Sequence, residues 1–137
     1  MKNSPEWVKV PPQAYSIVTG YFPETKPKDG SPDCRPLLVT QVLQSRSGAT
    51  AVRVCYGTTK LKFPQKANID LIVQNSSDLD GCGLLRPTRF VIDPSQQTVL
   101  LWGDKYFEPW SGSKHPRRGM LPLDLQKEFA WLMAQHL

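Results

Sequence analysis

Cysteines and histidines are few in this sequence, and their spacing excludes two common kinds of site. The three cysteines, at 34, 55 and 82, form no C-x-x-C pair, and the two histidines, at 115 and 136, lie far downstream of them. An odd number of isolated cysteines predicts neither a disulfide framework nor a zinc site. We therefore expect three reduced thiols that pack as small buried hydrophobic side chains.

Long apolar segments are also missing. No run approaches the ~20 residues that cross a bilayer, and the N-terminal residues MKNSPEW contain no apolar stretch followed by a cleavage site. These absences predict a soluble protein that stays in the cytoplasm and does not bind membranes. With 137 residues, the chain has the usual size of one domain.

Acidic residues are scarce in one segment, residues 31–66. This segment has one acid, Asp33, against six basic residues and thus carries the whole net charge of +5, because the other residues balance eleven bases with eleven acids. The six are Arg35, Arg46, Arg53, Lys60, Lys62 and Lys66. Such an excess attracts a polyanion through phosphate contacts and counterion release. Charge alone also fits a solvated basic face that binds nothing specific.

Short β-rich runs dominate the chain after an irregular, proline-containing lead-in at 1–14. Runs at 15–22, 36–43, 49–56, 69–73, 88–92 and 98–102 predict strands. The glycine-containing stretch 44–48 predicts a hairpin turn, and 78–83 predicts a second turn. Because the connections are too short for crossover helices, the pattern favours a mostly β fold, a small antiparallel barrel over 15–102.

The period of the apolar residues changes near the C-terminus. Five residues recur at 4-4-3-4 spacing, the period of one helix face: Leu121, Leu125, Phe129, Leu132 and His136. A proline at 122 suits a first helical turn. This pattern predicts a loop at 103–120 and an amphipathic helix over 121–137 that packs on the barrel or on a partner. We thus expect residues 15–137 to form a single domain.

Polar residues at the strand boundaries are the candidates for chemistry. Arg35 precedes a proline that stiffens the start of a buried strand, Thr58 follows a glycine at the end of the next, and Arg86 and Thr88 open a later strand. Guanidinium and hydroxyl groups suit a phosphate or a carboxylate. Each motif alone is also explained by an internal ion pair or a local turn.

The order of these pieces resembles the MazF/PemK family of toxins from bacterial toxin–antitoxin systems. The resemblance covers residues 15 to 102: a first strand, a long polar loop, Arg35-Pro36 leading into LLVT, a strand ending at Gly57-Thr58-Thr59, and the segment GLLRPT at 83–88. Because family members are SH3-like barrels, the resemblance implies an SH3-like barrel here, followed by the C-terminal helix.

The family's activity is sequence-selective cleavage of RNA. The resemblance therefore implies a metal-independent endoribonuclease without a cofactor, which cuts single-stranded mRNA and inhibits growth. In this chemistry the ribose 2′-hydroxyl attacks the adjacent phosphorus and leaves a cyclic phosphate and a 5′-hydroxyl. The resemblance also implies a homodimer and a cognate antitoxin whose acidic tail covers the active groove.

The resemblance assigns roles to individual residues. Arg35 and Thr58 match the family's active-site arginine and threonine, Arg86 matches an arginine of some PemK-type members, and Thr88 stands where those members have an aspartate. These four are the catalytic candidates. The general base is unassigned, with Asp33 and Glu24 of the long loop as candidates. Candidates for contact with RNA are Lys26, Lys28, Thr59, Lys60, Lys62 and Arg89.

Other functions stay open at this level. A second hypothesis is that the barrel binds nucleic acid or a protein without cleaving it, and the threonine at 88 favours this hypothesis. A third hypothesis is that the chain is a relative of the similarly folded CcdB toxins, which bind DNA gyrase. His115 lies in a basic loop where it contacts RNA phosphates or is only solvated, and His136 on the apolar helix face suits packing better than catalysis.

Overall fold

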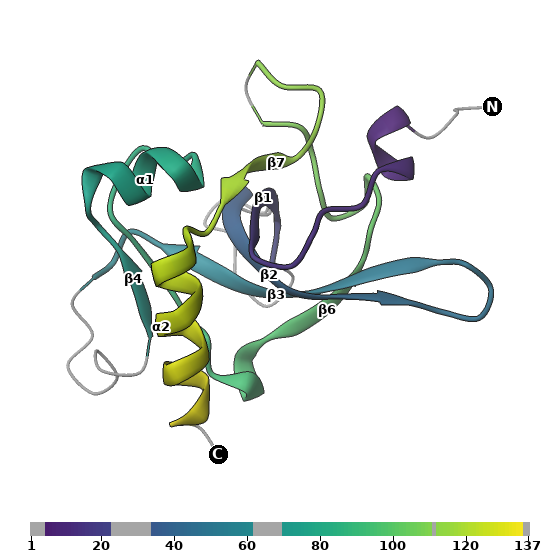
Figure 1. The fold of residues 1–137 in the computed structure, drawn as a ribbon. Helices are drawn as coiled ribbons and strands as arrows, with labels where there is room; N and C mark the ends of the chain where they lie inside the picture. The colour runs from purple at the N-terminus through teal and green to yellow at the C-terminus, as the bar shows by residue number, and fades with distance from the viewer. Residues whose placement is uncertain (1–4, 23–33, 62–69, 111, 136–137) are drawn as a thin grey trace.

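The computed structural model describes residues 5–22, 34–61, 70–110 and 112–135 (Figure 1). In chain order the elements are the 3-10 helix η1 (Glu6–Lys9), β1 (Ser16–Tyr21), β2 (Cys34–Gln44), β3 (Thr50–Thr58), β4 (Leu71–Val73), α1 (Ser76–Cys82), β5 (Thr88–Phe90), the 3-10 helix η2 (Pro94–Gln96), β6 (Thr98–Leu101), β7 (Arg117–Met120) and α2 (Leu123–Ala134). None of the helices in these ranges is long and apolar enough to cross a membrane.

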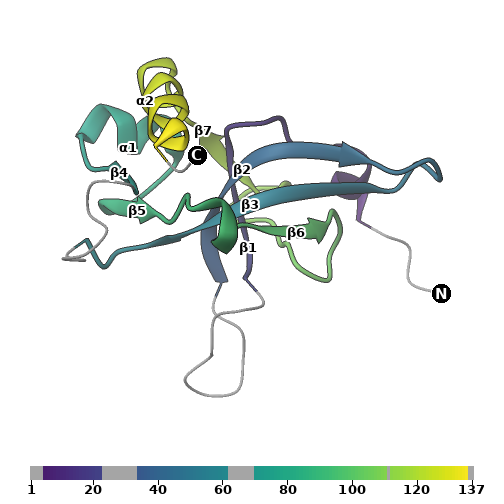
Figure 2. The same ribbon diagram turned by 90° about the horizontal axis from the view of Figure 1, so that it is seen from below.

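The strands form one curled antiparallel sheet in the order β4-β5-β3-β2-β1-β7, with β6 also paired to β3. β3 is central because β2 occupies one of its edges, while β6 and β5 share the other at Ala51–Val54 and at Gly57–Thr58 (Figure 2). The outermost strands β4 and β7 do not pair with each other. Instead, α2 contacts β4 and α1 contacts β7. The predicted mostly β, barrel-like fold with a C-terminal helix is confirmed.

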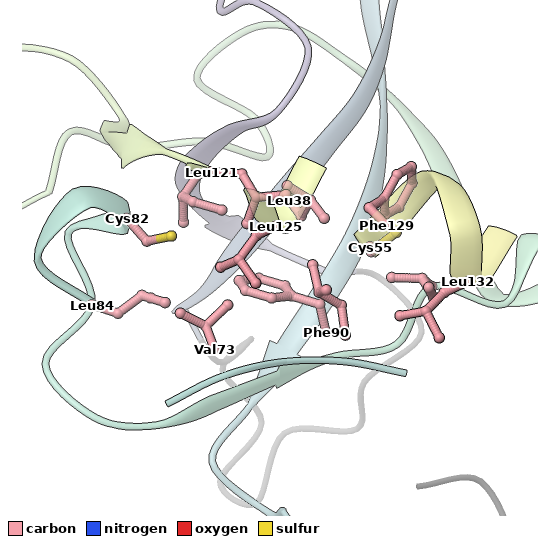
Figure 3. Close-up of a cluster of buried hydrophobic side chains, with 13 residues drawn as sticks. Leu38, Cys55, Val73, Cys82, Leu84, Phe90, Leu121, Leu125, Phe129 and Leu132 are labelled. Carbon is pink, nitrogen blue, oxygen red and sulfur yellow. The ribbon is translucent and has the colours of Figure 1, made fainter. Parts of the chain in front are cut away.

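Both faces of the central strands are buried, which explains the nearly continuous apolar runs of β1 to β3. Neighbouring residues such as Leu37 and Leu38 point to opposite faces and join different clusters. The helix-side core lies between the sheet and the two α-helices and includes Leu38, Phe90 and Phe129 (Figure 3). The tryptophan core on the other face contains Trp7 and Trp102, whose ring centres are 5.1 Å apart.

Two predictions of local structure are wrong. Residues 78–82 of the predicted turn belong to α1. This helix begins after Asn75, whose side chain accepts a hydrogen bond from Ser77 N, and ends before Gly83, which has φ of +67°. The predicted loop 103–120 contains β7, whose residues pair with β1. β7 is short and charged, so its sequence carries no strand pattern and tertiary pairing alone specifies it.

The two ends of the chain also differ from the predictions. The lead-in is not wholly irregular, since η1 places Trp7 in the tryptophan core. The C-terminal helix is shorter than predicted and begins after Pro122; its buried face consists of Leu125, Phe129 and Leu132 as predicted. His136 lies outside the described residues.

The cysteines are all free, as expected, but they are not all buried. Cys55 and Cys82 lie inside the protein, whereas Cys34 at the start of β2 is exposed. Its position at the end of the sheet places its side chain beside polar groups instead of in the core.

Candidate nucleic-acid interface

Antiparallel pairing brings the predicted strand-boundary motifs together at one end of the sheet. Leu37 pairs with Tyr56, so the Arg35-Pro36 pair of β2 lies beside the end of β3. On the other edge of β3, Gly57 pairs with Phe90 and Thr58 pairs with Arg89. Three segments that are far apart in the sequence therefore occupy adjacent strands.

Gly57 makes this close approach possible. A Cβ atom at this position would lie 2.9 Å from Pro36 O and 2.9 Å from Thr88 Cγ2, which is closer than real Cβ contacts allow. Glycine is thus the residue that lets β2 and β5 close in on β3. The close packing of the strands therefore explains the glycine at position 57, before the candidate threonine, without reference to function.

Arg35 is half-buried next to aromatic side chains. Its guanidinium carbon lies 5.8 Å from the centre of the Tyr56 ring, within the range of a cation–π contact. The Tyr56 ring in turn packs against Phe22, with centres 5.1 Å apart. The arginine is therefore held at the border of the tryptophan core.

The residues that close β3 combine hydroxyl and ammonium groups. Thr58 Oγ1 accepts a hydrogen bond from Lys60 N at 3.2 Å, which fixes the turn and leaves the hydroxyl proton for another acceptor. Thr59 and Lys60 are exposed. This turn therefore presents hydroxyl and ammonium donors to solvent.

The segment before β5 places its two candidates differently. Arg86 is exposed, whereas Thr88 is buried and its Oγ1 donates a hydrogen bond to Arg86 O at 2.9 Å. The Thr88 hydroxyl thus shapes the turn that carries Arg86. The structure does not bring this hydroxyl to the surface beside Arg35.

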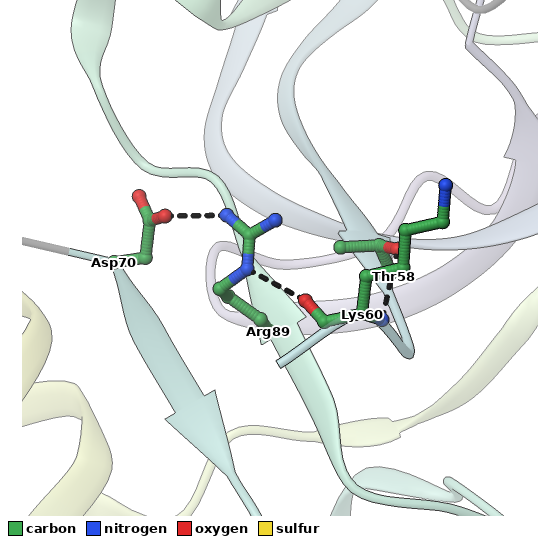
Figure 4. Close-up of polar contacts among 4 residues, drawn as sticks. All are labelled: Thr58, Lys60, Asp70 and Arg89. Atoms are coloured by element: carbon green, nitrogen blue, oxygen red, sulfur yellow. Dashed lines mark hydrogen bonds and ion pairs between the residues drawn. The ribbon is translucent and has the colours of Figure 1, made fainter. Parts of the chain in front are cut away.

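Arg89 is buried, and Figure 4 shows its contacts with Asp70 and Lys60. Arg89 Nη1 lies 2.5 Å from Asp70 Oδ2, and Arg89 Nε donates to Lys60 O at 2.9 Å. The side chain links β5 to the start of β4 and to the end of β3, so it supports the candidate turn from within. Lys26, Lys28, Lys62, Glu24 and Asp33 lie outside the described residues.

A second polar group, which the sequence did not indicate, lies at the same end of the sheet. Tyr21 of β1 is paired with Cys34 of β2. The segment after β6 crosses β1, where Glu108 N donates to Thr19 O, and this contact places Glu108 Oε2 2.8 Å from Tyr21 Oη. Cys34 lies close enough to the Glu108 carboxylate for that group to raise its pKa. We refer to Tyr21, Cys34 and Glu108 as the carboxylate cluster.

β7 adds a cation next to this cluster. Arg118 Nε donates to Thr19 Oγ1 at 2.8 Å, and the guanidinium carbon lies 4.8 Å from the centre of the Trp110 ring. The positive charge of Arg118 acts to lower the pKa of Cys34, but this effect is smaller than those that raise it. Arg118 is thus positioned by β1 below and by an aromatic ring beside it.

The phenol and the thiol of the carboxylate cluster keep their protons at neutral pH. The hydrogen bond to Glu108, together with burial and the negative charge of Glu108, raises the pKa of Tyr21 to about 12. Although the residue as a whole is exposed, the groups around its thiol partly desolvate it, and this effect, followed by the interaction with Glu108, raises the pKa of Cys34 to about 12. Glu108 therefore lies beside two groups that stay neutral, and it accepts a hydrogen bond from one of them, Tyr21.

Cys34 is expected to react slowly with iodoacetamide although it is exposed. With a pKa of about 12, its thiolate fraction at pH 8 is roughly a thousandfold below that of an ordinary thiol with a pKa of about 8.5. Glu108→Gln removes the charge and lowers the pKa, so labelling followed by mass spectrometry should become several-fold faster. Labelling of the wild-type protein at the rate of free cysteine would contradict the assigned environment.

The same shifts set a pH dependence of stability. Both pKa values are higher in the folded protein than in the unfolded chain, so the neutral forms favour folding. This stabilisation is complete below the ordinary pKa of about 8.5 for a thiol. It is lost as the pH rises toward 12, because deprotonation of Tyr21 and Cys34 then favours the unfolded chain.

His115 contacts backbone groups and aromatic rings of the protein itself. Its Nε2 lies 2.7 Å from Val10 O, its Nδ1 accepts a hydrogen bond from Arg117 N at 3.0 Å, and its ring packs on Trp7 and Trp102. Both ring nitrogens are thus occupied by backbone groups. His115 fastens the loop before β7 to the lead-in, and its nitrogens are not directed at a phosphate.

Comparison with known proteins yields no match, neither to a family model nor to a curated protein sequence. The resemblance to MazF/PemK toxins thus depends on the short motifs quoted above.

Proposed function

We propose that this chain is a metal-independent endoribonuclease that cleaves single-stranded RNA at the start of β2, as a growth-inhibiting toxin of the MazF/PemK kind. The carboxylate cluster carries the proposal, because Glu108 accepts a hydrogen bond from Tyr21 at 2.8 Å and its charge raises the pKa of the neighbouring Cys34. Cleavage of RNA by its own 2′-hydroxyl needs a base, an acid and cations around the phosphorus. Glu108, Tyr21, Arg118 and Arg35 supply these groups at one end of the sheet.

In this mechanism Glu108 takes the proton of the ribose 2′-hydroxyl as the 2′-oxygen attacks phosphorus. Tyr21, which keeps its proton at neutral pH because its pKa is about 12, donates a proton to the leaving 5′-oxygen as the P–O bond breaks. Arg118 and Arg35 stabilise the negative charge of the phosphorane. The products carry a 2′,3′-cyclic phosphate and a 5′-hydroxyl.

Residues around these groups suit the binding of a flexible strand. Thr58, Thr59 and Lys60 present donors for a neighbouring phosphate, and Arg86 is exposed before β5. The Trp110 ring beside Arg118 offers a surface on which a base stacks. We therefore propose that RNA runs across the end of β3 and β2 toward β7.

The test is cleavage of a single-stranded RNA in EDTA, with the ends identified by mass spectrometry. Wild-type protein should leave cyclic-phosphate ends, and Arg35→Ala and Glu108→Gln should each lower the rate about a hundredfold or more, because each removes a group from the transition state. Arg46→Ala is the matched control. Arg46 is exposed in the turn of the β2–β3 hairpin, which extends away from the helices (Figure 1), so its loss should leave the rate unchanged.

Two results would contradict this proposal. One is a folded wild-type protein that cuts no RNA. The other is a rate that falls equally in Arg35→Ala and Arg46→Ala, since general charge would then explain the effect. Circular dichroism of each variant separates loss of activity from loss of folding.

A second candidate function is binding of nucleic acid without cleavage. Thr88 favours it, because this residue replaces an acid of the PemK-type pattern and its hydroxyl is used within the turn. Salt-dependent binding of RNA without products would identify this function. The cognate antitoxin, the homodimer and the cytoplasmic location belong to the same proposal, and an acidic tail suits the basic surface as RNA does.

A further inference from the structure

An acidic cavity lies on the helix side of the sheet, where β4 meets α1 and α2. Its volume is about 630 Å³, within the usual range for small-molecule sites. Residues of β4, α1 and α2 and the segments that flank β4 line it: Asp70, Ile72, Gln74, Asn75, Asp78, Asp124, Leu125, Glu128, Trp131 and Leu132. Four of these ten residues are acids and none is basic, although the chain as a whole carries +5.

The acids of this cavity lack cationic partners. Asp78, Asp124 and Glu128 form no ion pair with any of the described residues. Asp124 and Glu128 are four residues apart on α2, where like charges repel and destabilise a helix. A bound cation would remove this repulsion.

Asp70 provides an independent indication of a ligand. Its side chain is 1% exposed, and Oδ2 is held by Arg89. The other oxygen, Oδ1, is buried and has no hydrogen-bond partner among the residues that the structure describes. A buried carboxylate oxygen without a donor is costly, and Asp70 lines this cavity. The cavity therefore lacks a hydrogen-bond donor as well as positive charge.

The apolar part of the wall restricts the kind of cation. Ile72, Leu125 and Trp131 line the same space, and Trp131 is 63% exposed, which is unusual for so large an aromatic side chain. Tryptophan attracts organic cations through its ring face, and its edge packs against methylene groups. A ligand with several ammonium groups separated by methylene chains matches both the acids and the apolar wall.

We propose that this cavity binds a linear aliphatic polyamine. Its ammonium groups pair with Asp78, Asp124 and Glu128, and one of them donates a hydrogen bond to Asp70 Oδ1. Its methylene groups lie on Ile72, Leu125 and Trp131. The proposal is independent of the proposed RNA chemistry, because none of these residues belongs to the carboxylate cluster or to the strand-boundary motifs.

The experiment is titration of the RNA-free protein with spermidine at 150 mM NaCl, followed by calorimetry and tryptophan fluorescence. We expect saturable binding of one spermidine per chain. The double variant Asp124→Asn/Glu128→Gln should weaken binding at least tenfold, and Trp131→Phe should remove most of the fluorescence change. Asp104→Asn is the matched control, because Asp104 is an exposed acid that does not line the cavity, and it should bind as the wild type does.

Three outcomes would overturn the proposal: absence of saturable binding, equal weakening in the Asp104→Asn control, and displacement of spermidine by an equal concentration of Mg²⁺. The last would mean that the acids attract cations only by charge. Thermal unfolding of the double variant guards against misfolding. Both positions are exposed and removal of the repulsion should not lower its Tm.

Discussion

Replacement of Asp70 by alanine is expected to destabilise the protein by about 3–5 kcal/mol, because it removes the carboxylate with which the buried Arg89 guanidinium forms an ion pair. The two side chains are 1% and 4% exposed, and Nη1 and Oδ2 are 2.5 Å apart. A buried guanidinium cannot recover its hydration, so the cost of its burial is no longer offset. Urea unfolding followed by circular dichroism measures the loss as a lower midpoint at unchanged slope.

Two controls separate this effect from a general sensitivity to charge. In the double variant Asp70→Leu/Arg89→Met both charges are gone, and most of the lost stability should return. Glu6→Ala breaks an ion pair on the surface, in which the side chains of Glu6 and Lys9 are 91% and 74% exposed. It should have no measurable effect on stability. Equal stability of Asp70→Ala and the double variant would show that the buried charge is not the cause.

Replacement of Gly83 by alanine should cost about 3 kcal/mol, the sum of two effects. Gly83 has φ of +67°, a left-handed conformation that costs an L-residue ~1–2 kcal/mol. Its added Cβ would also overlap the carbonyl oxygen of Arg118 in β7, and overpacking costs typically ~1–3 kcal/mol. The free energy of unfolding from urea titration is the measurement.

Gly48 offers a matched control for the conformational part. It has φ of +88°, but nothing lies within 4 Å of a Cβ placed there. Gly48→Ala should therefore cost only the ~1–2 kcal/mol of the left-handed conformation. If both variants lose the same stability, the close contact between α1 and β7 has no energetic weight.

The central strands could be predicted from sequence because their apolar and β-branched residues alternate or run continuously over whole strands. The apolar period of α2 likewise predicted its buried face, Leu125, Phe129 and Leu132. α1 was missed because its seven residues, SSDLDGC, contain only two that are buried or partly buried and apolar. β7, with the sequence RRGM, was missed because pairing with β1 specifies it and its own residues do not.

The candidate site divides in the same way. The sequence places Arg35, Thr58 and Arg86 at strand boundaries, which is compatible with one common end of a barrel, but only the pairing of β2, β3 and β5 shows that these boundaries are adjacent. That Thr88 and Arg89 turn inward could not be foreseen, because the partners Arg86 O and Asp70 are fixed by the packing of β5 between β3 and β4.

The sequence by itself determined the secondary structure of the long elements, the location of the positive charge in residues 31–66, and the strand-boundary motifs, because each depends on residues close together in the chain. Only the tertiary structure decided that Glu108 meets Tyr21, 87 residues away, and that Asp78 and Glu128 line one cavity. Contacts of this kind depend on how separate elements pack. Packing is a property of the whole fold, and no local pattern of residues records it.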